Sequence, residues 1–141
     1  MKTVLIVDDL PANVDVLLGF LANAGYRVLV SDSGHRALEQ LARTLPDIIL
    51  LDLMMPGLNG IETCKRIKAN QEWSHIPVLM MTAADELSKK LAAFEAGAVD
   101  FVTKPVQPEE VQARVQTHLE LRELQQRLEQ KNQELTLAYS D

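Results

Sequence analysis

Short apolar runs alternate along the chain with segments whose apolar residues recur at helical spacing. An apolar run bounded by turn residues is typical of a strand that is buried on both faces of a parallel sheet. The runs predict strands at residues 4–7, 26–30, 48–51, 76–81 and 98–102, of which the second alternates apolar and polar positions.

The segments between and after these runs predict five helices, with Pro11 and Pro108 near the starts of the first and last. Gly25 and Gly97 are the expected stops of the first and fourth helices. The predicted inward positions are Val14, Leu17, Leu18 and Leu21, then Ala37, Leu38, Leu41 and Ala42, then Ile61, Cys64 and Ile67, then Leu87, Leu91 and Phe94, and finally Val111, Val115 and Leu119.

Five strand–helix units in strict alternation predict a doubly wound α/β fold, in which helices cover both faces of a five-stranded parallel sheet. Ligands of such folds bind at the carboxyl ends of the strands. Asp8 and Asp9 follow the first strand and Asp52 follows the third, while Thr82 ends the fourth and Lys104 follows the fifth. The sequence therefore predicts that three carboxylates, a hydroxyl and an amine meet at one edge of the sheet.

Most of these residues also have an ordinary structural interpretation. Asp9 suits a turn, Thr82 lies just before a helix for which Asp85 is the expected cap, and Lys104 suits a solvated loop. Asp52 is harder to interpret in this way, because an ionised carboxylate at the end of so apolar a run is costly unless it is paired or binds a metal. A single site accounts for all of these positions together.

The residue types predict phosphoryl chemistry at this site. Neighbouring carboxylates repel one another, and a divalent cation with oxygen ligands, Mg²⁺ rather than zinc, relieves the repulsion. A carboxylate can also act as a nucleophile that forms an acyl phosphate, while a hydroxyl and an amine stabilise phosphoryl oxygens. The chain has neither G-x-x-x-x-G-K-[ST] nor G-x-G-x-x-G, so no nucleotide site is predicted.

Composition and charge limit the setting. The chain has 141 residues, of which 47% are hydrophobic and 24% charged, and its net charge is −6. An acidic chain argues against a nucleic-acid surface, and no run approaches the length of a membrane span. Cys64 is the single cysteine, so an internal disulfide is excluded and a reducing cytoplasm is expected.

Four segments of the chain resemble the response-regulator receiver domains of two-component signalling: "VLIVDD", "PDIILLDLMMPGLNG", "IPVLMMTA" and "GAVDFVTKP". The likeness covers residues 2–119. It implies a flavodoxin-like sheet with strand order 2-1-3-4-5 and a domain spanning residues 1–119. It also implies that Asp52 accepts a phosphoryl group from a histidine kinase or a phosphotransfer protein.

The resemblance assigns further roles at the site. Asp8 and Asp9 match the acidic pair of the family, which would hold Mg²⁺ together with Asp52 and the backbone carbonyl of Met54. The remaining matches, all implied by the resemblance, are Thr82 as a switch hydroxyl, Phe101 as a switch aromatic, and Lys104 as the site lysine, placed by a cis bond to Pro105.

The implied switch works through the added charge of the phosphoryl group. Thr82 moves toward the phosphoryl group and vacates space for Phe101 to turn inward. This biases an existing equilibrium and changes the face formed by the fourth helix, the fifth strand and the fifth helix. A plain core aromatic is the alternative interpretation of Phe101.

Residues 120–141 form a tail rich in Glu, Gln, Arg, Lys and Leu, and no Gly or Pro follows Pro108. We expect one helix to run from Pro108 to the end. Two interpretations remain open: a parallel coiled-coil dimer, and a frayed solvated helix. The helix also suits a linker to an output domain absent from this chain. The seam positions, at alternating spacings of three and four, are Leu121, Leu124, Leu128, Lys131, Leu135 and Ala138.

Three functions remain open on the sequence. The first is a phosphorylation-dependent switch that acts only on its own aspartate and turns over no separate substrate. The second is a Mg²⁺-dependent phosphatase of the haloacid-dehalogenase kind, against which the adjacency of Asp8 and Asp9 and the position of Asp52 on the third strand both argue. The third is a dimerisation module with a vestigial site.

Overall fold

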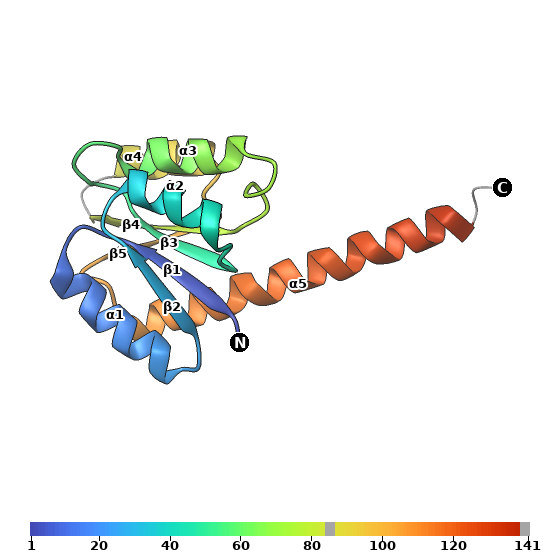
Figure 1. Ribbon diagram of the computed structural model, residues 1–141, viewed down its shortest axis with the longest axis horizontal. Helices are drawn as coiled ribbons and strands as arrows, with labels where there is room; N and C mark the ends of the chain where they lie inside the picture. The colour runs from blue at the N-terminus through green and yellow to red at the C-terminus, as the bar shows by residue number, and fades with distance from the viewer. Residues whose placement is uncertain (84–86, 139–141) are drawn as a thin grey trace.

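A five-stranded parallel sheet forms the middle layer of the computed structural model, which describes residues 1–83 and 87–138 (Figure 1). The strand order is β2-β1-β3-β4-β5, which confirms the doubly wound α/β fold and the order implied by the resemblance. In chain order the elements are β1 (Thr3–Val7), α1 (Pro11–Asn23), β2 (Arg27–Ser31), α2 (Gly34–Arg43), β3 (Ile48–Asp52), α3 (Gly60–Ala69), β4 (Val78–Ala83), α4 (Leu87–Glu95), β5 (Asp100–Lys104) and α5 (Pro108–Ala138).

Different helices cover the two faces of the sheet. α1 and α5 pack on one face, and α2, α3 and α4 pack on the other (Figure 1). Successive side chains of a strand point to opposite faces, so Val4 and Ile6 lie under α1 and α5, whereas Leu5 and Val7 lie under α2, α3 and α4. All four are fully buried, as expected for a strand with a continuous apolar run.

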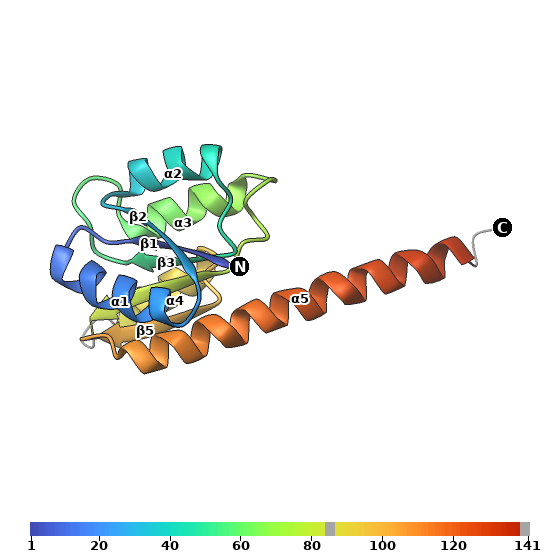
Figure 2. The same cartoon turned by 60° about the horizontal axis from the view of Figure 1, so that its bottom comes forward.

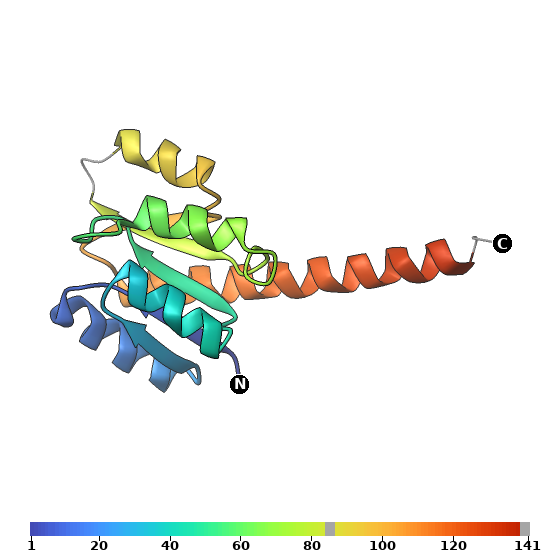
Figure 3. The same cartoon turned by 45° about the horizontal axis from the view of Figure 1, so that its top comes forward.

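The helix α5 runs without a break from Pro108 to Ala138, which confirms the expected single helix. Val111, Val115 and Leu119 pack against the sheet. The rest of α5 extends away from the other elements in every view (Figure 1, Figure 2 and Figure 3). Among the described helices, none is both long enough and apolar enough to cross a membrane.

Two strands begin later than the sequence predicts. Tyr26 lies outside β2, because its N–H donates to the carbonyl of Leu21 in the turn that ends α1, at 3.1 Å. Ile76 lies outside β4, because its N–H donates to the carbonyl of Trp73 at 3.0 Å. Pro77 has no N–H to offer a neighbouring strand, so β4 begins at the next residue.

The last strand is shifted by two residues from its predicted position. Ala98 belongs to the turn that ends α4, where its N–H donates to the carbonyl of Ala93 at 3.0 Å. β5 therefore runs to Lys104, which is the last residue of the strand and does not follow it as predicted.

Four predicted inward side chains are exposed instead: Ala42, and Leu18, Leu91 and Phe94, whose exposed fractions are 39%, 64% and 43%. Apolar residues spaced three and four apart form a broad stripe along a helix. This stripe is wider than the part of each helix that contacts the sheet, so side chains at its edges reach solvent. Asp85 and the side chain of Leu87 lie outside the described part of the chain.

Candidate functional site

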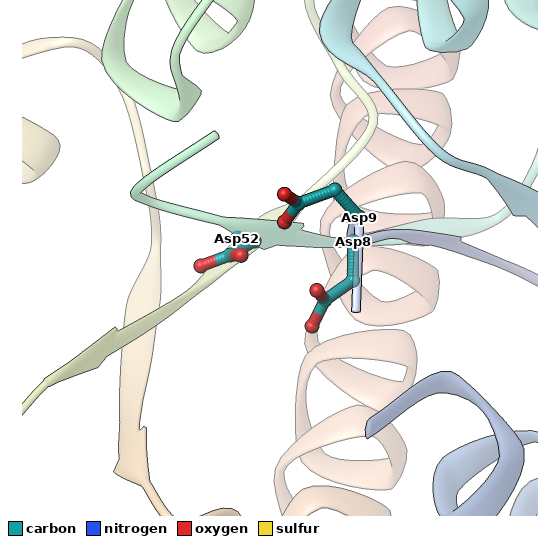
Figure 4. Close-up of side chains that lie close together, drawn as sticks. All are labelled: Asp8, Asp9 and Asp52. Carbon is teal, nitrogen blue, oxygen red and sulfur yellow. The ribbon is translucent and has the colours of Figure 1, made fainter. Parts of the chain in front are cut away.

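The carboxyl ends of β1 and β3 bring three acids together. Asp8 and Asp9 directly follow β1, Asp52 is the last residue of β3, and the two strands are neighbours in the sheet. Carboxylate oxygens of all three residues lie within 4.8 Å of one another (Figure 4). The meeting of these side chains at one edge follows from the parallel strand arrangement that the sequence predicts.

Asp52 is almost completely buried, with 1% of its surface exposed. Its Oδ1 accepts hydrogen bonds from the Lys104 ammonium at 2.8 Å and from the Met54 N–H at 3.3 Å. Its Oδ2 is buried and has no hydrogen-bond partner among the described residues. A buried carboxylate oxygen left in this state is costly, so its place in the fold points to a ligand that engages it.

The surroundings of Asp52 act on its ionisation in opposite directions. Burial raises the pKa of Asp52 above its ordinary value, and the nearby negative charge of Asp8 raises it further. The hydrogen bond and charge of Lys104 lower the pKa, as does the Met54 N–H, but burial prevails. A cation beside Oδ2 would favour the ionised carboxylate.

The carboxylate of Asp8 is fixed by local hydrogen bonds. Its Oδ1 accepts from the Leu10 N–H at 2.9 Å, and its Oδ2 accepts from the Asn13 side-chain amide at 3.4 Å. Asp8 is 2% exposed, whereas Asp9 is only half-buried. Sequence reasoning missed Asn13, although its position in the first turn of α1, five residues beyond Asp8, brings it back toward the strand end.

The hydroxyl and the amine lie on the two strands beyond Asp52. Met81 is the register partner of Asp52, and Thr82 is the next residue of β4. Thr82 is buried, and its hydroxyl donates to the carbonyl of Ala83 at 3.3 Å. Lys104 pairs with Ala83 in register and reaches back to Asp52, and its bond to Pro105 is cis, as the resemblance implies.

Phe101 lies apart from the acidic cluster, on the side of the sheet covered by α4. Its ring is half-buried and meets the Phe94 ring edge to face, with centroids 5.5 Å apart. The Lys90 ammonium lies over the Phe101 ring, 4.4 Å from its centroid. The sequence could not indicate this pair of contacts, which hold Phe101 against α4.

Gly60 is a second positioning residue that sequence reasoning did not identify beyond a tight loop. A Cβ at this position would overlap the carbonyl oxygen of Asp52 and lie 2.8 Å from the Cα of Leu53. The Gly60 N–H donates to the Leu53 carbonyl at 3.0 Å, so α3 begins directly against the end of β3. Only glycine allows this approach of the two backbones.

The residues present fit a hard divalent cation. All three clustered ligands are carboxylates, and Asp52 keeps one buried oxygen without a protein partner among the described residues. Oxygen-only donors suit Mg²⁺ better than zinc, which favours nitrogen and sulfur. The same arrangement sets the Asp52 carboxyl group beside an ammonium, which suits phosphoryl transfer.

Comparisons with known proteins agree with this geometry. The family model of the response regulator receiver domain matches residues 4–116. The chain is 43% identical to the response regulator PleD of Caulobacter vibrioides over 114 residues, which are 81% of this chain and 25% of that protein. It is 42% identical to the alkaline phosphatase synthesis transcriptional regulatory protein PhoP of Bacillus subtilis over 123 residues, which are 87% of this chain and 50% of that protein.

The chain therefore spans a quarter to a half of the length of these curated relatives. Among solved structures, the receiver domain of a sensor histidine kinase from Pseudomonas aeruginosa PAO1, with magnesium coordinated in its active-site cleft, is 29% identical, with a TM-score of 0.77. The match covers 84% of this chain and 97% of that one. Fold, motifs and relatives agree, and the chain belongs to the response regulator receiver domain family of two-component signalling.

Proposed function

We propose that this protein is a phosphorylation-dependent switch whose phosphoacceptor is Asp52. The observation that carries the proposal is the state of this carboxylate, which is buried, bonded to Lys104 through one oxygen, and without a protein partner among the described residues at the other. A carboxylate held in this way is fixed in position for reaction with a phosphorus atom.

In the transfer, the Asp52 carboxylate attacks the phosphorus of a phosphohistidine on a histidine kinase or a phosphotransfer protein. The new P–O bond forms as the N–P bond breaks, and the released histidine nitrogen takes up a proton. Lys104, which already contacts Asp52, and the Thr82 hydroxyl, which moves toward the phosphoryl group, donate to phosphoryl oxygens and stabilise the charge that develops. The products are an aspartyl phosphate and a neutral histidine.

The proposed magnesium ligands are Asp8, Asp9, Asp52 and the backbone carbonyl of Met54. Mg²⁺ would supply charge neutralisation between these carboxylates and a phosphoryl oxygen. The local hydrogen bonds of Asp8 support this assignment, because they hold the carboxylate in position before any ion arrives. The magnesium in the Pseudomonas receiver domain supports it independently.

The proposed output is a change at the face formed by α4, β5 and α5. A phosphoryl group adds a charge of about −1.5 to −2 at neutral pH. Thr82 moves toward it, and Phe101 leaves its contacts with Phe94 and Lys90 and turns inward. The protein then acts as a regulator in the cytoplasm, and the only reactions that it catalyses are its own phosphorylation and dephosphorylation.

The second part of the proposal concerns the tail. We assign residues 1–119 to the receiver domain and residues 120–141 to a helical extension that forms a homodimer or leads to an output domain outside this chain. The four seam leucines support an extension with a partner, because they are all exposed, by 46–62%. They are Leu121, Leu124, Leu128 and Leu135.

The test is phosphorylation by a small donor. The protein is incubated with Mg²⁺ and phosphoramidate, and intact-protein mass spectrometry counts the phosphoryl groups. We expect one group on the wild type and none on Asp52→Asn. Asp32→Asn is the matched control, because Asp32 follows β2 at the same edge but lies outside the acidic cluster and pairs with Arg36.

The alternatives give different results in the same experiment. Steady release of phosphate that persists in Asp52→Asn would indicate a phosphatase and contradict the proposal. No adduct with phosphoramidate, and no binding of beryllium fluoride by ¹⁹F NMR, would indicate a module with a vestigial site. For the switch, Thr82→Ala should still accept the phosphoryl group but lose the change in the Phe101 ring signals, and an unaltered Phe101 change would overturn that step.

A further inference from the structure

A groove of about 730 Å³ lies at the edge of the sheet opposite the acidic site. Pro77 precedes β4 and Val99 precedes β5, and both line the groove, which places it at the amino-terminal ends of these strands. The opposite wall is the stretch of α5 that begins at His118 and continues beyond the sheet. The groove is therefore closed on one side by the body of the domain and on the other by the extended helix.

Basic side chains gather in this groove although the chain as a whole is acidic, with a net charge of −6. Lys68 and His75 line the wall formed by the domain, and Arg122 lines the helical wall. Burial lowers the pKa of His75, and the charges of Arg122 and Lys68 lower it further. Burial also lowers the pKa of Lys68, and Arg122 adds to that effect. These three groups thus face one another within electrostatic range.

Two cations of the groove have hydrogen-bond donors that no described residue accepts. The guanidinium of Arg122 donates from Nη1 to the carbonyl of Asp47 at 2.8 Å, but its Nε is buried without a partner among the described residues. Lys68 donates to the carbonyls of Ser74 at 2.9 Å and Ile76 at 2.6 Å, which uses two of its three N–H bonds. A buried donor without an acceptor is rare and calls for a ligand or an ordered water.

We propose that this groove binds an oxyanion, a carboxylate or a phosphate carried on an apolar body. The Arg122 guanidinium donates to either group, Lys68 adds charge from the opposite wall, and His75 offers a ring N–H there. Apolar surface on both walls, from Pro77 and Val99 and from the exposed Leu121, accommodates the body of the ligand. The volume lies within the range of small-molecule sites.

Such a ligand would join the two walls of the groove. It would tie Lys68 and His75 of the domain to Arg122 of α5, and so favour one direction of the extended helix. The site is separate from the acidic cluster, because it lies at the other ends of the strands and shares no residue with it. The proposal therefore does not depend on phosphorylation of Asp52.

The test is a titration of the full chain, without Mg²⁺, followed by ¹H–¹⁵N NMR. Three probes separate the sources of the anion: inorganic phosphate, phenyl phosphate and benzoate. We expect shifts at His75 and Arg122, with phenyl phosphate at least about tenfold tighter than inorganic phosphate because its ring meets the apolar walls. Tighter binding of benzoate than of phenyl phosphate would identify the natural group as a carboxylate, and the reverse would identify a phosphate.

Some variants should weaken anion binding in the groove, and one should strengthen it. Arg122→Gln and His75→Glu should each weaken phenyl phosphate about tenfold. Glu129, the carboxylate that lines the groove, opposes an anion, so Glu129→Gln should strengthen binding severalfold. Arg127→Gln is the matched control, because Arg127 lies on the same helix, is exposed and pairs with Glu123.

Asp52→Asn should bind the probes as the wild type does, which separates this test from that of the phosphoacceptor. His75→Glu keeps the test valid if Arg122→Gln fails to fold, because His75 is exposed and no hydrogen bond of the described fold uses its side chain. Equal affinity in the wild type, Arg122→Gln and His75→Glu, or shifts only at molar probe concentration, would overturn the proposal.

Discussion

The two halves of α5 share one continuous helix but lie in different surroundings. In residues 108–119, Val111, Val115 and Leu119 lie in the core beneath the sheet. In residues 120–138, the leucines of the helix are all exposed, and Leu128 is 62% exposed. The first half is stabilised by burial within the chain, whereas the second half has its apolar seam open to a partner.

The spacing of apolar residues differs between the halves in the same way. Val111, Val115 and Leu119 recur every four residues and form one stripe against the sheet. Beyond Leu119 the apolar positions alternate between spacings of three and four, which is the pattern of a narrow coiled-coil seam. The spacing distinguishes a helix that packs on its own domain from a helix suited to a second copy.

The largest expected effect comes from a truncation in the buried half. Val115→Ala removes two buried methyl groups and leaves a cavity, so the free energy of unfolding should fall by about 2 kcal/mol. Leu128→Ala in the exposed half should change it by less than about 0.5 kcal/mol. Urea unfolding at concentrations where the protein is monomeric measures both values. Equal losses would show that the two halves are not differently packed.

A substitution at Lys131 tests the exposed half of α5, where it should change dimerisation. Lys131 interrupts the seam between Leu128 and Leu135, and a charge at a core position of a coiled coil lowers stability. Lys131→Leu should therefore tighten dimerisation at least about tenfold, or about 1.4 kcal/mol. Sedimentation equilibrium measures the dissociation constant.

The control for this change is Gln130→Leu, which adds the same side chain outside the seam. Its dissociation constant should match that of the wild type. If Gln130→Leu and Lys131→Leu tighten association equally, general hydrophobicity and not the seam drives it, and the coiled-coil proposal fails.

The junction between the two halves contains a charged cluster. Asp100 at the start of β5 accepts from the Arg114 guanidinium at 2.7 Å and lies 3.0 Å from the His118 imidazole. Burial opposes ionisation of Asp100, but the hydrogen bonds from His118, the Phe101 N–H and Arg114 outweigh it, and the pKa of Asp100 lies below its ordinary value. These bonds favour the ionised carboxylate of the folded state.

Asp100→Asn should lower the free energy of unfolding at neutral pH by about 1 kcal/mol, because the charge-assisted bonds weaken. The lowered pKa of Asp100 also sets how stability depends on pH. The contribution of ionised Asp100 to the free energy of unfolding is complete above the ordinary carboxyl value of 3.8, and it is lost as the pH falls through the lower folded-state pKa. Urea unfolding from pH 6 down to pH 3 should show a shallower acid loss for Asp100→Asn. Glu110→Gln, which changes a more exposed partner of Arg114, should keep the wild-type slope.

The sequence predicts the architecture and the cluster of acids well, because both follow from the spacing of apolar residues and from the order of strands and helices. Alternation of apolar runs with helical segments implies parallel strands, and parallel strands bring Asp8, Asp9 and Asp52 to one edge. The strand boundaries were less accurate, because the turns that end α1 and α4 use backbone hydrogen bonds of Tyr26 and Ala98.

The residues that support the site could not be predicted from the sequence, because their contacts depend on the folded structure. Gly60 is required because a Cβ there would overlap the carbonyl oxygen of Asp52, and Asn13 acts through a side-chain hydrogen bond to Asp8. Neither contact follows from the spacing of apolar residues or from a sequence motif. The same holds for the groove beside Arg122, which joins residues 68–99 to the part of α5 that continues beyond the sheet.

The smallest expected effect concerns the ion pair where α5 leaves the domain. Lys2 and Glu123 lie 3.2 Å apart, with exposed side-chain fractions of 46% and 41%. Solvent screens such a pair, so Glu123→Gln should lower the free energy of unfolding by less than about 0.5 kcal/mol, and the difference should disappear at about 1 M salt. Urea unfolding at low and high salt measures this difference. A loss as large as that of Val115→Ala would mean that charge, and not burial up to Leu119, holds α5 to the domain, and would move the boundary between the two halves toward the C-terminus.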